Sequence, residues 1–183
     1  PVFGDLRYEN KLVALFRTYK PQVVFHAAAY KNVPLMEENP VEAVIANVYG
    51  SRNVADKCLE YGVEKMVMIS TDKAVNPTNI MGCTKRLAEI YVQSMARDVE
   101  GGRRAGKTQF VTTRFGNVLG SNGSVIPRFR DQIAKGGPVT VTHPDITRFF
   151  MTIPEACRLV MEAATMGLVN KIIIFDKGPV SKT

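Results

Sequence analysis

Four short apolar runs predict buried β-strands. They span residues 22–26 (QVVFH), 65–70 (KMVMIS), 110–115 (FVTTRF) and 171–175 (KIIIF). Their apolar residues are consecutive instead of alternating with polar ones, which is typical of parallel strands that are covered on both faces. The runs therefore predict a parallel sheet with helices on both sides.

Helical patterns separate these runs. From the spacing of apolar positions we expect helices over residues 12–19, 39–62, 78–97, 125–133 and 152–167. Two of them start with a capping pattern, in which Asn39 precedes Pro40 and Thr152 stands ahead of Glu155. Strands that alternate with helices are the signature of an α/β fold with right-handed crossovers.

The texture of the chain changes after Phe115, where glycine, serine, asparagine and proline become frequent. We therefore predict a boundary there, between a first part (1–115) and a smaller mixed lobe (116–183) that is interleaved with the sheet. The chain opens on PVFGD, which looks like the end of a strand, and no Gly-x-Gly-x-x-Gly precedes it. The expected fold is a Rossmann-like doubly wound sheet, truncated before its phosphate-binding unit and also short of some C-terminal residues.

The composition is that of one ordinary globular domain. Of the 183 residues 45% are hydrophobic and 22% are charged, and no apolar stretch approaches the ~18–20 residues of a membrane span. Cys58, Cys83 and Cys157 are widely spaced and odd in number, so we expect small buried apolar residues instead of disulfides. With two histidines, the sequence has no recognisable metal cluster.

The net charge of +7 would suit nucleic-acid binding. Part of the excess, however, lies in one apparent loop with Arg103, Arg104 and Lys107, and no motif of interleaved aromatic and basic residues is present. Basic side chains also suit a ligand that carries a diphosphate. We therefore favour a diphosphate-containing ligand over nucleic acid.

Polar side chains follow the strand that ends at Ser70. Ligands of open α/β sheets bind outside the carboxyl ends of the strands, which places Thr71, Asp72 and Lys73 at the ligand. Three adjacent hydrogen-bonding or ionisable side chains at this point indicate acid–base chemistry. A solvated turn with an ordinary Asp–Lys pair is the alternative interpretation.

The next helix carries Met81 and Lys85, which are four residues apart and therefore share one helix face. A cation near a helix start opposes the helix dipole, so Lys85 fits better if it meets the hydroxyl or phosphate groups of a ligand. A solvated surface lysine is the alternative. Further along, Asn117, Ser121 and Ser124 lie in a glycine-rich loop ahead of a helix, which suits a phosphate, although a plain loop has the same composition.

Five segments carry a resemblance to a known family. They are HAAAYKNVPLMEENPVEA (26–43), NVYGSRNVAD (47–56), MISTDKAVNPTNIMGCTKRLAE (68–89), TTRFGNVLGSNGSVIPRF (112–129) and VTHPDITRFFMTIPEA (141–156). Together they resemble the extended short-chain dehydrogenase/reductase superfamily. Within it they are most similar to the capsular-polysaccharide and flagellin-glycan branch, the nucleotide-sugar 4,6-dehydratases that act on UDP-N-acetylglucosamine.

One departure from the superfamily pattern falls at Met81. The pattern is Tyr-x-x-x-Lys, whereas this sequence has Met81-Gly82-Cys83-Thr84-Lys85. Methionine marks one subgroup of these dehydratases, so the substitution resembles a subgroup feature and not decay. Members of that subgroup often carry an N-terminal membrane-spanning region, which implies a cytoplasmic catalytic part in a longer protein that is tethered to the inner membrane.

The resemblance implies an internal redox reaction. Hydride leaves sugar C4 for a tightly held NAD or NADP, the C5 proton becomes acidic, water is lost across C5 and C6, and hydride returns at C6. Thr71 would hydrogen-bond O4, while Asp72 and Lys73 would share the proton transfers at C5 and C6 in an order that stays open. Lys85 would hold the nicotinamide ribose, and Met81 would pack beside the ligands.

The resemblance also implies that residues 1–115 form a partial NAD(P)-binding Rossmann domain and that residues 116–183 are mainly a nucleotide-sugar-binding lobe. It further implies which residues bind the ligands. The cofactor residues are Asp5 at the adenine, Ala27, Ala28 and Ala29 as small residues beside the cofactor, Asn47, Ser70 and Lys85. The substrate residues are Lys31, Asn117, Ser124 and Arg148, which would meet the UDP group. No metal is implied, and the choice between NAD and NADP stays open because the discriminating residue would precede residue 1. We expect a homo-oligomer.

Three other classes of protein stay open. A 4- or 5-epimerase of the same fold would not need an acid at C6, so the pair Asp72 and Lys73 favours elimination. A catalytically inactive NAD(P)-binding scaffold would explain Met81, but the presence of Thr71, Asp72, Lys73 and Lys85 argues against it. A nucleic-acid-binding module would show strongly salt-dependent binding.

Overall fold

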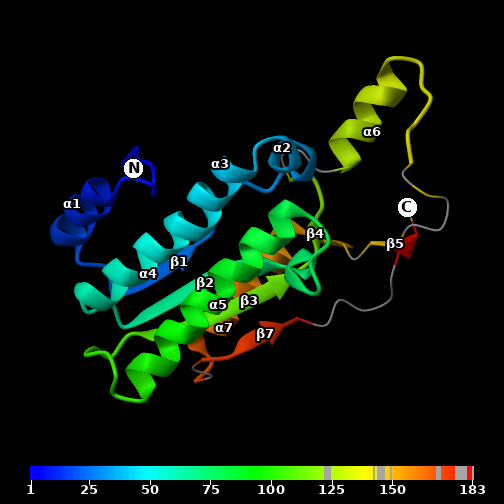
Figure 1. The fold of residues 1–183 in the computed structure, drawn as a ribbon. Coiled ribbons are helices and arrows are strands. Elements are labelled where there is room, and N and C mark those ends of the chain that lie inside the picture. Colours follow the sequence, from blue (N-terminus) through cyan, green and yellow to red (C-terminus); the bar gives the residue numbers. More distant parts are fainter. Residues whose placement is uncertain are drawn as a thin grey trace.

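The computed structural model describes residues 1–121, 125–141, 143, 147–148, 150–167, 170–175 and 181–182. Its centre is a parallel sheet with the spatial order β1 (Val23–His26), β2 (Lys65–Thr71), β3 (Gln109–Phe115) and β7 (Ile172–Ile174). The register of β2 and β3 places Ser70 beside Arg114 and Thr71 beside Phe115. All four predicted strands are present, which confirms the α/β fold class (Figure 1).

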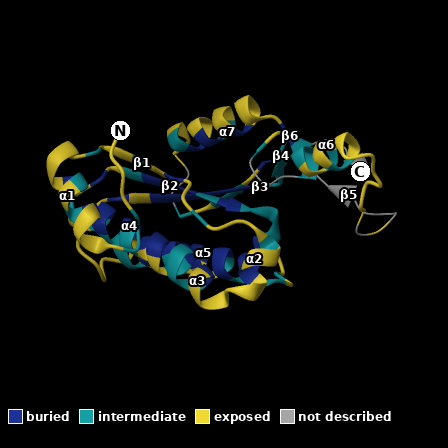
Figure 2. Ribbon diagram, turned by 90° about the horizontal axis from the view of Figure 1, so that it is seen from above, coloured by how far each residue is buried: buried dark blue, intermediate teal, exposed yellow. Residues whose placement is uncertain are grey.

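Helices cover both faces of this sheet. α5 (Ile80–Glu100) and the long helical stretch that precedes it lie on one face, and α7 (Ile153–Thr165) lies on the other (Figures 1 and 2). The long stretch consists of α3 (Pro40–Val44), a π-helical turn (Ile45–Tyr49) and α4 (Gly50–Glu60). α1 (Glu9–Tyr19) packs against α4. The doubly wound arrangement predicted from the sequence is therefore confirmed.

The main core lies between the sheet and the layer of α4 and α5. Its buried members include Met66, Met68 and Phe110 from the strands and Val54, Cys58, Ala88, Val92 and Met95 from the helices. A second cluster under α7 joins Val111, Ala163 and Phe175. Phe110 and Val111 are adjacent in β3 but serve opposite cores. This explains why apolar residues run consecutively along the strands.

Two of the predicted helix starts are confirmed and one is wrong in detail. Asn79 caps the first turn of α5 through its side chain, and Thr152 and Glu155 form a reciprocal capping box at α7. Asn39 does not cap α3, because its side-chain amide donates a hydrogen bond to the carbonyl of Leu35 (3.0 Å) instead. The predicted helix 39–62 is also not regular, since the π-helical turn interrupts it.

A short helix, α2 (Val33–Glu38), was not predicted. The side chain of Asn32 caps it by accepting a hydrogen bond from Leu35 N (3.1 Å), and proline stands in its first turn. α2 packs on the N-terminal part of α5. It is too short for its apolar residues to show a helical period, which is why the sequence pattern missed it.

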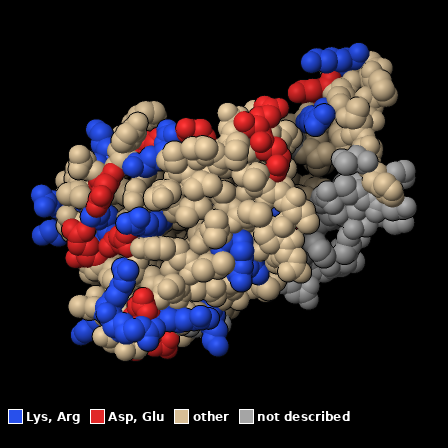
Figure 3. Space-filling view, viewed as in Figure 1, with Lys and Arg blue, Asp and Glu red and all other residues tan. Residues whose placement is uncertain are grey.

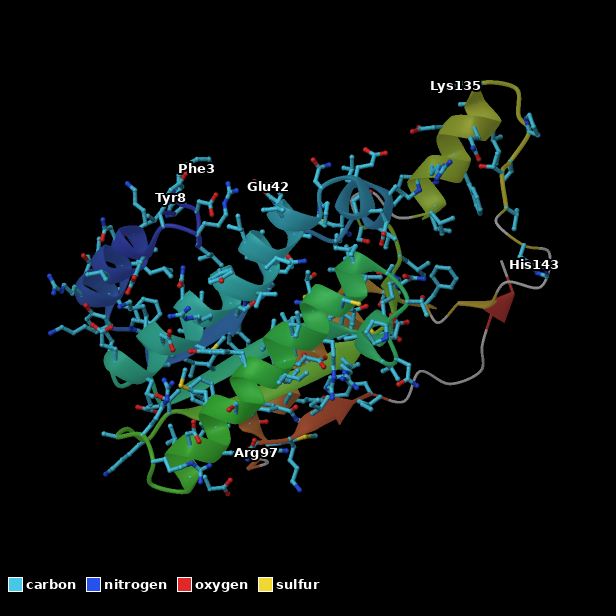
Figure 4. All side chains as sticks on the ribbon, in the orientation of Figure 1. Phe3, Tyr8, Glu42, Arg97, Lys135 and His143 are labelled. Carbon is cyan, nitrogen blue, oxygen red and sulfur yellow. The ribbon has the colours of Figure 1, made fainter. Side chains whose placement is uncertain are left out.

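Residues after 115 contribute to the sheet layers and to a small lobe. In the lobe, β4 (Asn117–Val118) pairs in parallel with β6 (Phe150–Met151), and β5 (Thr147–Arg148) pairs antiparallel with β8 (Ser181–Lys182). α6 (Val125–Ala134) extends away from the sheet and buries none of its described side chains. Figure 4 shows Lys135 and His143 on this part of the molecule, beyond the end of the sheet. The division at residue 115 stays a prediction.

Three predictions from composition can be compared with the structure. Cys58 is buried as expected, but Cys83 is only partly buried and Cys157 is exposed on α7, so the expectation was wrong for these two. In the basic loop, Arg103 forms an ion pair with Asp98 (2.7 Å), so its charge is balanced locally. None of the described helices is long and apolar enough to cross a membrane.

Candidate active site

Three of the predicted catalytic residues, Thr71, Asp72 and Lys73, lie at the last residue of β2 and directly after it and form one hydrogen-bonded group. We call residues 71–73 the catalytic turn after this predicted function. Asp72–Ala74 make a 3-10 turn whose start is fixed by Thr71, because Thr71 Oγ1 accepts a hydrogen bond from Lys73 N (3.3 Å). Thr71 Oγ1 also donates to Asp72 Oδ1 (2.9 Å), and Lys73 Nζ lies 3.2 Å from the same oxygen. A hydroxyl, a carboxylate and an ammonium therefore meet at the carboxyl edge of the sheet.

Asn117 of β4, two residues after the end of β3, also belongs to this group. Its Oδ1 accepts a hydrogen bond from Lys73 Nζ (3.0 Å), so the ammonium lies between the Asp72 carboxylate and the Asn117 amide. Partly exposed ion pairs contribute only about 0–1 kcal/mol to stability, so this contact matters little for folding. Its main consequence is that the Lys73 head group has a fixed position.

The other predicted substrate residues are described to different extents. Lys31 Nζ donates a hydrogen bond to Ser121 Oγ (3.3 Å), which joins the segment after β1 to the loop after β4. Arg148 lies in β5, but its side chain is not among the described ones, and Ser124 lies outside the described residues. Lys31 thus lies near one predicted ligand loop, whereas the positions of the other two side chains stay predictions.

Lys85 is buried and not a solvated surface lysine. It is 6% exposed, and its Nζ donates a hydrogen bond to the carbonyl of Ile69 in β2 (2.7 Å). Burial lowers the pKa of Lys85 to about 8, although the negative charge of Glu89 raises it in part. An ammonium in this state can still donate further hydrogen bonds to a ligand.

Met81 lies in a small apolar cluster beside the catalytic turn. It is 4% exposed and packs with Met36 of α2 and Ala43 of α3, with Val33 and Ile80 at the margin. The cluster closes because α2 lies across the start of α5. The position that carries tyrosine in the superfamily pattern is therefore filled by hydrocarbon and sulfur. The predicted packing function is consistent with this environment, but its contact with a ligand stays a prediction.

Asn47 fixes the segment that follows β1. It is 0% exposed, and its amide group accepts from Tyr30 N (2.7 Å) and donates to Tyr30 O (2.9 Å) and Thr84 Oγ1 (3.0 Å). These bonds link residues 27–30 to α5. Ala27 and Ala28 are exposed at the end of β1. The π-helical turn that contains Asn47 is of a kind that is frequent at functional sites, but a direct cofactor contact of Asn47 stays a prediction.

His26 is a buried neighbour that the sequence did not single out. Its Nε2 lies 2.8 Å from Ser51 Oγ, which itself donates to the carbonyl of Asn47 (2.6 Å). Because that hydroxyl has already donated its proton, His26 Nε2 is the donor of the first bond. Burial and the nearby charge of Lys85 lower the pKa of His26 to about 3, so the imidazole stays neutral.

Asp5 is not brought into the group at the carboxyl end of β2. Its carboxylate accepts hydrogen bonds from Arg7 N (2.9 Å) and from the Arg7 guanidinium (2.7 Å), which also contacts Glu42 of α3 (2.9 Å). The hydrogen bonds from Arg7 lower the pKa of Asp5. An adenine contact of Asp5 stays a prediction, and the carboxylate would have to share it with Arg7.

Gly82 allows the start of α5 to approach the catalytic turn. A Cβ at this position would clash with the carbonyl oxygen of Lys73 and would lie 3.1 Å from Pro77 Cβ. Asn79 stabilises the same contact by capping Gly82 N (2.8 Å). The sequence contained this signal, a glycine inside a helical pattern, but it was not recognised as a close approach.

Sequence reasoning also missed a buried ion pair behind Ser70. Glu89 of α5 is 0% exposed, and its carboxylate accepts hydrogen bonds from Arg114 Nε (2.7 Å) and Nη2 on β3 and from Arg86 Nη1 (3.0 Å). Ser70 is buried beside this pair, and its hydroxyl makes no hydrogen bond of ordinary geometry within the described part of the chain. Glu89 and Arg114 each lie among apolar residues of a different predicted element, so the sequence pattern gave no sign that they pair.

These features define a Rossmann-like α/β protein that presents acid–base side chains and a buried lysine at the carboxyl edge of its sheet. The chain belongs to the polysaccharide biosynthesis protein family, whose model matches residues 1–183. This agrees with the resemblance that the sequence motifs carry. The matched region includes both the sheet and the catalytic turn.

Relatives with names show the same affiliation. The chain is 53% identical to the capsular polysaccharide biosynthesis protein CapD of Staphylococcus aureus, over 97% of this chain and 29% of CapD. It is 40% identical to a UDP-N-acetylglucosamine 4,6-dehydratase (inverting) of Campylobacter jejuni, over 86% of this chain and 46% of that enzyme. It is 43% identical to a UDP-glucose 4-epimerase of Rickettsia canadensis, over 86% of this chain and 45% of that enzyme. The chain thus spans less than half the length of these relatives.

Solved structures confirm the fold. Pen from Bacillus thuringiensis is 37% identical, with a TM-score of 0.89 over 98% of this chain and 54% of that one. A UDP-glucose 4-epimerase of Thermus thermophilus, solved in complex with NAD, is 23% identical. Its TM-score is 0.81 over 97% of this chain and 63% of that one. At that identity the second likeness shows the fold alone.

We predict that Gly82→Ala separates α5 from the catalytic turn. The added methyl group meets a backbone oxygen that cannot rotate away, so we expect a stability loss of about 1–3 kcal/mol and a displaced Lys73. Calorimetry and activity of the whole protein should both show the change. Gly167→Ala is the matched control, because a Cβ there meets open space. Equal behaviour of the two variants would contradict the close approach.

Proposed function

We propose that the protein is a nucleotide-sugar 4,6-dehydratase that converts UDP-N-acetylglucosamine to a UDP-4-keto-6-deoxy sugar for surface polysaccharide or glycan synthesis. The observation that carries this proposal is the joined group of Thr71, Asp72 and Lys73, next to the buried Lys85. The Campylobacter jejuni relative, which is named for this activity, supports the substrate.

The elimination of water from C5 and C6 needs a base and an acid close together, and the ion pair of Asp72 and Lys73 supplies both. Its carboxylate can accept a proton and its ammonium can donate one, with 3.2 Å between them. The pair carries one transferable proton whichever partner holds it, so the assignment of base and acid stays open. Thr71 Oγ1 lies beside the pair and would hydrogen-bond the O4 oxygen.

The residues at the carboxyl edge fit the nicotinamide end of NAD or NADP. Lys85 presents a buried ammonium there, and Ala27 and Ala28 expose small side chains at the end of β1. When bound, the dinucleotide supplies the hydride acceptor for oxidation at sugar C4. Lys85 would donate a hydrogen bond to the ribose, and the buried Ser70, one residue before Thr71 on β2, is the other predicted cofactor residue at this edge. The NAD complex of the Thermus thermophilus fold relative is consistent with NAD.

The UDP end of the substrate would lie over the segments after β1 and β3. Lys31 and Ser121 meet there, and Asn117, four residues before Ser121, accepts a hydrogen bond from Lys73. An ammonium group and polar amide or hydroxyl groups suit a diphosphate. Ser124 and Arg148 belong to the same part of the chain and would complete the binding of UDP.

The experiment that tests the proposal uses the whole protein with UDP-N-acetylglucosamine and follows the sugar nucleotide by mass spectrometry. The expected product has lost one water. A product of unchanged mass but altered stereochemistry would instead establish the rival function, a 4- or 5-epimerase, which the Rickettsia canadensis relative keeps open. A sugar nucleotide that binds but does not react would support the other alternative, a catalytically inactive NAD(P)-binding scaffold.

We also propose that the protein is a homo-oligomer that works at the cytoplasmic side of a membrane. The support for assembly is an apolar surface on the outer sides of α3 and α5. It exposes Val41, Tyr49, Leu87 and Ile90, and a shallow apolar groove there is lined by Pro40, Val41, Val44, Ile45 and Tyr49. Figure 3 shows few charged side chains in the middle of this face. A membrane tether outside these residues follows from the sequence resemblance alone.

We predict that Asp72→Asn and Lys73→Met each abolish water loss while UDP-sugar binding stays near its original value. General acid–base groups contribute typically ~10²–10⁴-fold in rate, which sets the expected loss in kcat. Asp131→Asn on α6 is the control, because this exposed carboxylate lies outside the group at β2. Activity within a few-fold of the unaltered protein for both variants would remove the pair from the mechanism.

We predict that Met81→Leu keeps most of the dehydratase activity. The swap conserves volume within an apolar cluster and should cost less than about 1.5 kcal/mol. Met95→Leu, in the main core, is the control for the same exchange. Rates with UDP-N-acetylglucosamine and melting temperatures should change by similar small amounts in both variants. A Met81→Leu variant that folds but is inactive would show that the sulfur itself takes part.

We predict that Ile90→Glu shifts the assembly toward monomers. The substitution places a charge in the middle of the apolar surface on α5, where it would be desolvated by a second copy. Light scattering of the whole protein after size exclusion measures the change. Tyr19→Glu, at another exposed apolar side chain on α1, should leave the mass unchanged. If Ile90→Glu also leaves it unchanged, this surface is not the oligomer interface.

A further inference from the structure

Glu89 is a buried carboxylate that the proposed reaction does not use. Burial raises the pKa of Glu89, but the hydrogen bonds from the Arg114 and Arg86 guanidinium groups and the positive charge of Arg114 more than offset this, so its pKa is lowered. Glu89 is therefore ionised inside the protein. Charged groups of this kind add little net stability compared with apolar residues, so stability alone does not explain why a carboxylate stands here.

The position of Glu89 relates it directly to Lys85. The two side chains are four residues apart in α5 and therefore lie on the same side of the helix, facing the sheet. Lys85 is bonded to the Ile69 carbonyl of β2, and Glu89 is bonded to Arg114 of β3, whose register partner is Ser70. Successive turns of α5 are thus attached to β2 and to its neighbour β3.

The surroundings of Lys85 otherwise disfavour its charge. Besides Glu89, His26 on β1 interacts with Lys85. The elements around Lys85 also carry Arg114 on β3 and Arg86 on α5, which both bind Glu89, and the Asp72–Lys73 pair after β2. The imidazole is neutral, the guanidinium groups are positive, and the ion pair is neutral as a whole. The hydrogen-bond partner of Lys85 is an uncharged carbonyl. The negative charge of Glu89 counteracts the effect of burial on the ammonium.

We propose that Glu89 is a positioning residue for Lys85, which it keeps protonated inside the fold, and that Arg114 controls how much of the Glu89 charge Lys85 experiences. The ammonium form has three N–H donors, enough for both hydroxyl groups of a ribose and the Ile69 carbonyl, whereas the neutral amine has only two. Only the activity measurement below rests on the proposed dehydratase function. The titration of Lys85 does not depend on it.

Two substitutions separate this function from a purely structural one. Glu89→Gln keeps the shape and removes the charge, so Lys85 should lose its proton at a lower pH, by about one unit. Arg114→Gln removes the cation that shields Glu89, while Arg86 still holds the carboxylate, so Lys85 should lose its proton at a higher pH. A pair that serves stability alone would lower the melting temperature of both variants and leave the titration of Lys85 unchanged.

The titration is measured on the whole protein without ligands, by carbon NMR of lysine labelled at Cε. Lys85→Arg assigns the signal by its loss. Glu100→Gln, exposed at the other end of α5, is the matched control and should leave the titration of Lys85 unchanged. Opposite shifts in Glu89→Gln and Arg114→Gln support the proposal. Shifts in the same direction, or no shift, overturn it.

If Glu89→Gln does not fold, the titration of Lys85 in Arg114→Gln tests the proposal alone. An upward shift there supports the proposal, and an unchanged titration overturns it. In the activity measurement, the fall of kcat/KM on the alkaline side should move to lower pH in Glu89→Gln and to higher pH in Arg114→Gln. An inactive unaltered protein that shows both NMR shifts would contradict the dehydratase proposal and support the positioning function of Glu89.

Discussion

The attachment of α5 to the carboxyl ends of β2 and β3 is the constraint on which the rest of the site depends. Gly82 lets the helix start reach the carbonyl of Lys73, and the next turns are fixed by Lys85 at Ile69 and by Glu89 at Arg114. Because Thr71 is the last residue of β2, the helix and the catalytic turn cannot move independently. The fold thus sets the relative positions of the acid–base groups before any ligand binds, which is the arrangement that catalysis by oriented groups requires.

The position of α5 also explains the environment of Met81. The residue lies on the same helix face as Lys85, but the space that it fills is apolar and is closed by α2. A phenol there would have Met36 and Ala43 as neighbours, and neither can take or give a proton. In the proposed function the acid–base chemistry would therefore fall to Thr71, Asp72 and Lys73, which mutual hydrogen bonds hold together. The proposed mechanism needs no tyrosine at position 81.

The sequence predicted the elements that have a clear period or a capping motif, and it missed features that depend on tertiary contacts. The consecutive apolar runs predicted every strand of the main sheet, since parallel strands between two helical layers have no polar face. α2 was missed because six residues cannot show a helical period, and the cap at Asn39 failed because Leu35 offered a competing carbonyl. The Thr71–Lys73 turn was located through the rule for strand ends. The pairing of Glu89 with Arg114 could not be predicted, because it joins residues from different elements.

Solvent isotope exchange during turnover tests the central claim, that this tyrosine-free site carries out a dehydration, most directly. The reaction of UDP-N-acetylglucosamine is run in heavy water with the whole protein, and the product is analysed by mass spectrometry and NMR. Removal and return of the C5 proton through Asp72 or Lys73 predicts a dehydrated product with solvent deuterium at C5. A product without deuterium at C5, or an epimer that retains its water, would contradict the account.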